Sequence, residues 1–343
     1  MRSIRARPLS LSKHRPLPVL GGLLLLALIS VVLAVANGSV ALPLAHLPQA
    51  LLQMLEGRSD SLEATLVALR LGRALSAFVT GAALALAGVM MQALLRNSLA
   101  DPYILGISGG AAVGALATML WVSALWSIDL GAFAGAVAAA LLLYGMARAD
   151  LQGGASDGGD ALLLTGIVIS AGCMALVTLM LALAPQESLR GMVFWMMGDL
   201  GATPNRLLPW LVLAAGSAYA LGAARGLNVV AMHGNAASAL GVPVGRLRTG
   251  LFVCCALLTA TAVSSAGSIG FVGLIVPHAC RFALGPDHRL LLPAATLVGG
   301  AFLVLADTLA RVVVAPQQLP VGVITALIGV PIFLVQLHHI RRR

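Results

Sequence analysis

The side chains that could perform chemistry are few and widely separated in this 343-residue sequence, in which only 10% of residues are charged. The single lysine, Lys13, lies in the N-terminal tail. A P-loop needs a lysine after its glycines, so this chain cannot bind ATP by that route. His278 stands alone, and no nucleophile–base pair or cluster of metal ligands is present. We therefore expect no catalytic residue, no metal and no permanently bound cofactor, and hence no enzyme.

The acidic residues also bear on the class of transporter. They fall in loops or near the ends of apolar segments, and the deepest, Asp307, precedes Arg311 by one helical turn. Residues at this spacing form ordinary ion pairs on a helix. An ion-coupled secondary transporter usually keeps a carboxylate near the bilayer midplane, so we keep that function only as a lesser alternative.

Composition places the chain in the membrane. It is 59% hydrophobic with few aromatic residues, and its mean hydropathy is +0.99. One helical crossing takes about 20 apolar residues. Ten apolar segments lie near 17–36, 73–95, 103–122, 130–147, 161–184, 207–224, 249–267, 269–284, 290–313 and 321–340. These predict an all-α polytopic membrane protein with ten transmembrane helices in one domain, residues 1–343.

The basic residues predict the orientation. With both termini in the cytoplasm, including an N-terminal tail of residues 1–16, only six basic residues lie outside: Arg58, Arg70, Arg73, Arg190, Arg206 and Arg311. This agrees with the positive-inside rule, which also explains the net charge of +9 without nucleic acid. The start of the chain resembles a cleavable signal peptide, but segment 17–36 is long for a signal core, so we interpret it as a transmembrane helix.

Small residues predict how the helices pack. Gly106, Gly110 and Gly114 recur at four-residue spacing, as do Gly131 and Gly135, a pattern that typically allows close approach of helices in lipid. The run from Gly267 to Gly273 predicts a tight, buried break near the outer face. The cysteines Cys173, Cys254, Cys255 and Cys280 are interpreted as packing residues.

Residues 228–248 predict a cytoplasmic surface element. The stretch from Ala236 should form a short helix that ends at Gly241, because Pro243 prevents its continuation. A short apolar helix on that face could lie on lipid. We favour the alternative, a docking surface for a cytoplasmic partner.

A series of motifs resembles the permease family of type II ABC importers, which carry iron-siderophores, heme and cobalamin. They are Arg70-Leu-Gly-Arg73, Gly81–Gln92, Arg96–Pro102, Leu105–Ala111, Leu189–Gly198, Leu240–Arg248, Gly270–His278, Asp287–Pro293 and Leu319–Thr325. The resemblance implies a bacterial inner-membrane permease that works as a homodimer with a second copy of itself. It also implies two cytoplasmic ATPase subunits and a periplasmic substrate-binding protein.

The resemblance also implies roles for particular residues. Arg70, Arg73 and Arg311 match outward arginines that dock the binding protein. Residues 228–246 match the coupling helices, with Ala237, Leu240, Gly241 and Val242 facing the ATPase, although Asn235 and Ala236 replace the acidic residues usual there. Asn97, Asp157 and Asp160 match a cytoplasmic gate.

The substrate is the least constrained prediction. Leu189–Gly198 should form a short helix at the outer mouth of the path. There Arg190 could attract an anionic ligand such as a heme propionate, while Met192, Met196 and Met197 could offer an adaptable apolar surface. Simple packing against neighbouring helices is an equal interpretation. The pattern most resembles heme permeases, and a ferric siderophore or cobalamin stays open.

Overall fold

The computed structural model describes residues 16–40, 47–55, 61–122, 125–151, 158–201 and 207–341. Within these residues the chain forms α-helices and short 3₁₀ turns and no strand. The helices are α1 (Pro16–Ala36), α2 (Leu47–Leu55), α3 (Leu62–Leu94), α4 (Ile107–Trp121), α5 (Leu125–Leu151), α6 (Gly158–Leu183), α7 (Gln186–Met196), α8 (Leu207–His233), α9 (Val244–Ala266), α10 (Val272–Leu284), α11 (His288–Val312) and α12 (Val321–Arg341), with 3₁₀ turns η2 (Pro102–Leu105) and η3 (Gly234–Ser238).

The ten predicted apolar segments each become a helix. Among the described residues, seven helices are long and apolar enough to cross a membrane, and the three shorter apolar ones are Ile107–Trp121, Val272–Leu284 and Val321–Val335. Two short helices, α2 and α7, are additional to these crossings. The predicted boundaries differ most from the structure at α3, which already begins at Leu62, and at α8, which continues to His233.

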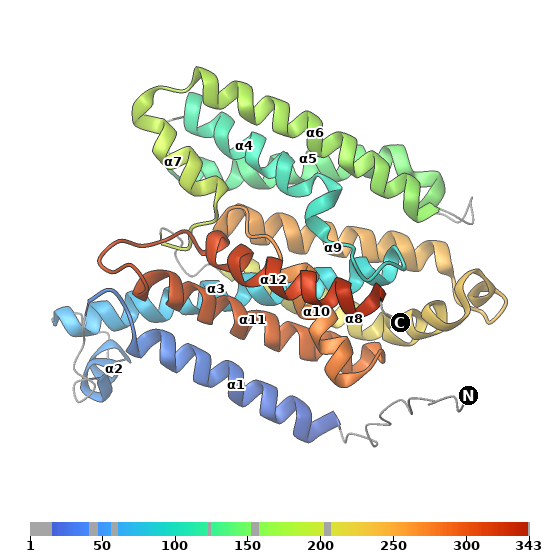
Figure 1. Cartoon of the computed structure of the whole chain (residues 1–343), viewed down its shortest axis with the longest axis horizontal. Coiled ribbons are helices and arrows are strands. Elements are labelled where there is room, and N and C mark those ends of the chain that lie inside the picture. Colours follow the sequence, from blue (N-terminus) through green and yellow to red (C-terminus); the bar gives the residue numbers. More distant parts are fainter. Residues whose placement is uncertain are drawn as a thin grey trace, which may run out of the picture.

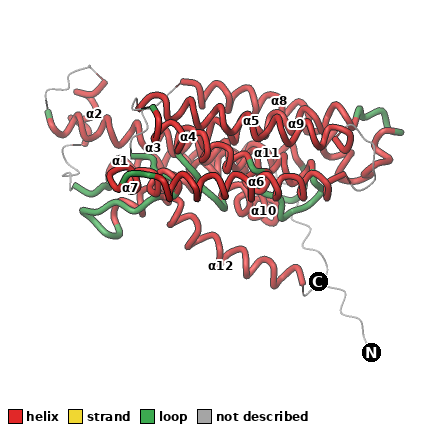
Figure 2. Tube along the Cα trace, turned by 90° about the horizontal axis from the view of Figure 1, so that it is seen from above, coloured by secondary structure: helices red, strands yellow, loops and turns green. Residues whose placement is uncertain are grey.

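Helix α3 is the centre of the bundle. Most of its residues from Ala74 to Leu94 are buried, and it contacts α1, α8, α9, α10 and α11. Helices α4, α5 and α6 pack together beside this group (Figure 1). Figure 2 shows α5, α8 and α9 on the face opposite α12. Helices α1 and α6 lie at the periphery, with most of their apolar side chains exposed.

The long axis of the bundle defines two ends, which we name by their contents. The arginine end, at the left of Figure 1, contains the end of α1, the start of α3, and α7. The connection end contains the start of α1, the end of α12 and the link between α8 and α9. Both described chain ends therefore lie at the same end of the bundle.

Glycines allow the closest helix contacts. A Cβ atom on Gly114 or Gly135 would overlap the backbone of the facing helix, so the close packing predicted at these glycines is confirmed, and it joins α4 to α5. Gly81 packs in the same way against Gly299 of α11, and Gly88 against Gly273 of α10. Gly106 has a different role, because its φ of +80° lets the chain turn from η2 into α4.

The predicted break between α9 and α10 is present and mostly buried, but it reaches deeper than expected. Gly267 lies against Trp195 of α7, whereas Gly273 lies against Leu84 in the second half of α3. The hydroxyl of Tyr103 accepts a hydrogen bond from the N–H of Ile269 inside the break. Helix α10 has only 13 residues, or about 20 Å. It can be this short because the break that precedes it spans part of the thickness of the bundle.

The four cysteines are free thiols. Cys255 and Cys280 are buried, and Cys173 and Cys254 are half-buried. This agrees with their interpretation as packing residues.

The contact between α4 and α5 yields a stability prediction with an internal control. Gly135→Ala should lower the stability of the folded chain by about 1–3 kcal/mol, because the new methyl overlaps the Gly110 carbonyl. Gly145→Ala on the same helix meets no atom within 4 Å, so it should be neutral or stabilising by up to about 1 kcal/mol. Thermal unfolding in detergent measures both, and equal effects would contradict the close contact.

Candidate functional site

An ion-pair cluster lies at the arginine end, and its centre is Asp307. The side chain of Asp307 is only 1% exposed. Arg73 donates from Nε to both carboxylate oxygens at 3.0 Å and from Nη2 to Oδ1 at 2.8 Å. Arg311 Nε lies 3.1 Å from Oδ2. One carboxylate therefore connects α3 to α11 through two guanidinium groups.

Two arginines also hold the end of α1. Arg70 donates to the carbonyl oxygens of Val35 at 3.1 Å and Ala36 at 3.4 Å, and to that of Val40. Arg311 donates to those of Ala34 and Asn37, each at 3.4 Å. The last carbonyls of a helix lack intrahelical partners and carry partial negative charge. These arginines therefore fix α1 against α3 and α11.

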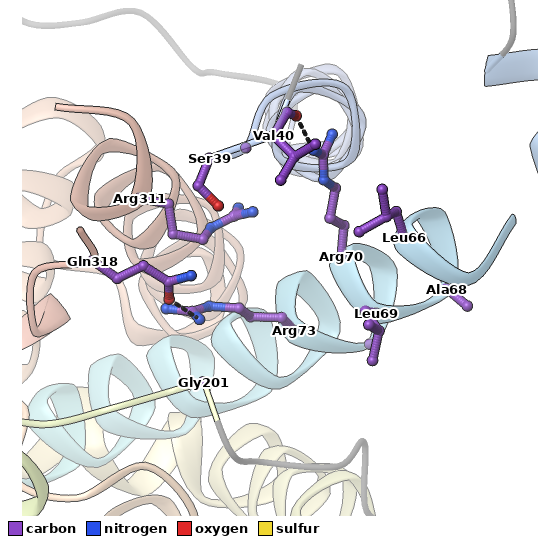
Figure 3. A pocket seen from close by; sticks show the side chains of 12 residues that line it. Ser39, Val40, Leu66, Ala68, Leu69, Arg70, Arg73, Gly201, Arg311 and Gln318 are labelled. Carbon is purple, nitrogen blue, oxygen red and sulfur yellow. Dashed lines mark hydrogen bonds between the residues drawn. The ribbon is translucent and has the colours of Figure 1, made fainter. Parts of the chain in front are cut away.

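These contacts show that the three arginines predicted to face outward are engaged within the protein. The three side chains line a cavity of about 490 Å³ together with Gly38, Gly201 and Gln318 (Figure 3). Yet Arg70 is 7% exposed, Arg311 is 4% exposed and the side chain of Arg73 is 12% exposed. The expectation of exposed charges was therefore wrong. Arg73 has the most accessible guanidinium and also donates to the exposed Gln318 at 2.9 Å.

The connection end presents the link between α8 and α9. Residues 228–233 belong to α8 and residues 244–246 to α9, so the element predicted over 228–246 is reduced to residues 234–243, which we call the connection. The predicted short helix is a 3₁₀ turn, η3 (Gly234–Ser238). Gly241 reverses the chain with a φ of +83° before Pro243, as its position suggested.

The four residues predicted to face an ATPase are not equivalent. Ala237 is completely buried, so it supports the turn from inside. Leu240 is 60% exposed, Gly241 is exposed and Val242 is half-buried. The surface that the connection offers to a partner is thus centred on Leu240.

The sequence did not predict the contacts that hold the connection and the end of α8 in the bundle. The Arg96 guanidinium packs over Gly234. Asn228, near the end of α8, donates to Asp287 Oδ1 at 2.7 Å and accepts from the His288 N–H at 3.0 Å. Asp287 caps α11, and the N–H of Arg289 is the main cause of its lowered pKa. The Asp287 N-cap pattern could have been found from the sequence.

The predicted gate residues are only partly placed. Asn97 is exposed in the turn after α3, where its Oδ1 accepts from the Leu99 N–H at 2.9 Å. This is a local turn-forming contact. Asp157 lies outside the described residues, and Asp160 is in the first turn of α6 (Gly158–Leu183). Their assignment to a gate stays a prediction.

The structure of α7 contradicts one of the contacts predicted for the substrate path. Met192 is fully buried in the core, so it cannot present its thioether to a substrate in this conformation. Met196 is half-buried and Met197 exposed. Arg190 is exposed and lies over the ring of Phe194, with Cζ 5.5 Å from the ring centroid. Among the described residues, no group of His, Cys, Asp or Glu could hold a metal ion.

The apolar helices indicate a membrane protein, and comparison with known proteins identifies its kind. Residues 25–339 match the FecCD transport family. This chain belongs to the FecCD family and is a permease of the ABC importer class.

Three similar proteins illustrate the relationship. The cobalamin import system permease protein BtuC of Halobacterium salinarum is 40% identical over 270 residues, 78% of this chain and 71% of that protein. The hemin transport system permease protein HmuU of Yersinia pestis is 38% identical over 279 residues, 78% of this chain and 80% of that protein. A solved structure of a proposed metal-chelate type ABC transporter, in an inward-facing conformation, has a TM-score of 0.80 and 30% identity, covering 94% of this chain and 99% of that one.

The Asp307 cluster predicts a large loss of stability when its charge is removed. Asp307→Asn leaves the buried Arg311 and the half-buried Arg73 without a counter-charge, so it should lower the free energy of unfolding by about 3–5 kcal/mol. Adding Arg73→Gln should restore part of this loss, because one unpaired charge is then removed. Thermal unfolding of the single variants and of the double variant measures this double-mutant cycle. Glu187→Gln, an exposed carboxylate in the first turn of α7, is the control and should have almost no effect.

Proposed function

We propose that this chain is the membrane permease of an ATP-driven importer that moves heme from the periplasm to the cytoplasm. The observation that carries the proposal is the match to the FecCD family over residues 25–339, together with the similarity to a hemin permease. The slightly higher identity to a cobalamin permease keeps cobalamin as the second candidate. Both ligands are large metal-holding macrocycles, and a ferric siderophore is the third.

The assembly that we propose has two copies of this chain, two cytoplasmic ATPase subunits and a periplasmic binding protein. The apolar bundle supplies a path and no energy source, since the sequence has no P-loop lysine. Leu240 on the connection is the exposed apolar contact that we assign to the ATPase. Arg73, beside the cavity at the arginine end, is the contact that we assign to the binding protein.

The distribution of charge supports the proposed orientation in a bacterial inner membrane. Among the described residues, the halves of the helices toward the connection end carry Arg96, Arg148, Arg225, Arg246, Arg248, Arg281, Arg289 and Arg341, and those toward the arginine end carry Arg70, Arg73, Arg190 and Arg311. The positive-inside rule then puts the connection end in the cytoplasm. Both chain ends would be cytoplasmic, and the connection would face the compartment that contains ATP.

Helix α7, which we assign to the entrance of the substrate path, exposes both charged and apolar side chains. Arg190 and Met197 are exposed and Met196 is half-buried. An exposed guanidinium could attract the propionates of heme, while thioethers adapt to a flat apolar ring. Cobalamin lacks such a pair of free carboxylates, so Arg190 should matter less for its entry.

Uptake into proteoliposomes tests the proposal. The chain is reconstituted with its ATPase, ATP is enclosed, and heme, cobalamin or a ferric siderophore is offered with its own binding protein. We expect ATP-dependent uptake of heme, and loss of uptake to the level of empty vesicles when the ATPase is inactivated by mutation. Uptake of cobalamin without uptake of heme would show that cobalamin, and not heme, is the substrate. Uptake driven by an ion gradient without the ATPase would overturn the ABC mechanism.

A charge added at Gln318 tests the docking role of Arg73 without disturbing buried groups. Gln318→Glu puts a carboxylate beside the Arg73 guanidinium, where it should compete with acidic residues of the binding protein. An exposed ion pair contributes about 0.2–1 kcal/mol, so affinity should fall by up to about fivefold, and less at high salt. Gln317→Glu is the matched control, since Gln317 is also exposed. Equal weakening by both variants would contradict a specific role for Arg73.

A further inference from the structure

The surface between α5 and α9 contains a groove that none of the roles above uses. It is a cavity of about 300 Å³, and its lining is almost entirely apolar. It is lined by Ala140, Leu141 and Tyr144 of α5 and by Phe252, Val253 and Ala256 of α9. The groove exists because the small residues Ala140 and Ala256 leave space between the helices, while the rings of Tyr144 and Phe252 stack at 6.0 Å.

The groove opens toward the membrane. Both helices belong to the spans that are long and apolar enough to cross a bilayer. Leu141 is 64% exposed and Val253 is 46% exposed. Helices α5 and α9 also lie on the face opposite α12 (Figure 2). An acyl chain of the surrounding bilayer can therefore reach this groove.

At the connection end the groove becomes basic. A second cavity, lined by Gly245, Arg246, Thr249 and Gly250, shares Thr249 with the first. Arg246 is exposed. The two cavities are therefore neighbours at Thr249, with an apolar one along the helices and a cationic one at the start of α9.

A second arginine lies one helical turn from the apolar lining. Arg148 follows Tyr144 by four residues on α5 and is exposed. Residues four apart on a helix lie on the same side, so Arg148 lies beside the groove on α5, as Arg246 lies beside it on α9.

We propose that this groove binds an anionic glycerophospholipid. One acyl chain lies along Ala140, Val253 and Ala256, and the phosphate lies near Arg148 and Arg246. Two guanidinium groups favour a lipid with net negative charge over a zwitterionic one. The bound headgroup stabilises the first turn of α9, directly after Pro243, and so supports the connection that precedes it.

Thermal unfolding of the delipidated full-length chain in detergent tests this proposal. We expect phosphatidylglycerol to raise the unfolding temperature at lower concentration than phosphatidylcholine does. Arg246→Gln should weaken the effect of phosphatidylglycerol about fivefold, the contribution of one basic residue at an anionic surface, and leave that of phosphatidylcholine unchanged. Arg289→Gln is the matched control, because Arg289 is exposed at the same end on α11, and should leave both unchanged.

A second variant tests the apolar part. Ala140→Leu puts a larger side chain into the groove and should weaken the effect of both lipids. Soluble glycerol 3-phosphate, which has no acyl chain, should not reproduce the effect of phosphatidylglycerol. Because Arg246 is exposed, its variant keeps the test decisive if Ala140→Leu fails to fold.

Several results would overturn the proposal. One is equal protection by phosphatidylglycerol and phosphatidylcholine, and another is full protection by glycerol 3-phosphate. If Arg246→Gln weakened only the association with the ATPase, the arginines would belong to a protein interface. If Ala140→Leu changed the oligomeric state in light scattering, the groove would be a contact between copies of this chain. The test does not depend on which substrate is transported.

Discussion

The close approach of α3 to its neighbours is the constraint on which the rest of the structure depends. Gly81 faces Gly299 of α11 and Gly88 faces Gly273 of α10, with too little space for a Cβ atom at these positions. In a bilayer the hydrophobic effect does not drive helices together, so van der Waals contact between close backbones contributes much of the association. Once α3 is fixed in this way, its first turns place Arg70 and Arg73 beside α1 and α11, and its end places Arg96 beside the connection.

At the arginine end, the charged side chains stabilise contacts within the protein, and the same group is available to a partner. Arg70 and Arg311 stabilise the carbonyl end of α1, and Asp307 keeps Arg73 and Arg311 at a fixed separation. Burial of charge is tolerated because every guanidinium has a carboxylate or carbonyl oxygen close by. A partner that approaches this end therefore meets a preorganised group, Arg73 with Gln318, rather than freely moving side chains.

The two ends of the bundle differ in the kind of surface that they present. At the arginine end the accessible group is a guanidinium beside a cavity. At the connection end it is the apolar side chain of Leu240, held by a turn whose own alanine, Ala237, is buried. The Asn228–Asp287 hydrogen bond joins this turn to the start of α11, the helix that carries Asp307 at its other end. A single rigid helix thus connects the neighbourhoods of both surfaces.

The sequence by itself determined the class of protein, the ten apolar helices and the break after Gly267, because the bilayer requires long apolar segments with satisfied backbone groups. It also determined that the glycine-rich helix faces pack closely, since four-residue spacing places the glycines on one face, but the structure decided that α4 packs against α5. Only the tertiary structure decided which arginines are buried, that Met192 faces the core and that Arg96 packs over Gly234. The reason is that the exposure of a side chain and its partner depend on helices far away in the sequence. Val35 and Arg70, or Arg73 and Asp307, meet only after α1, α3 and α11 have packed together.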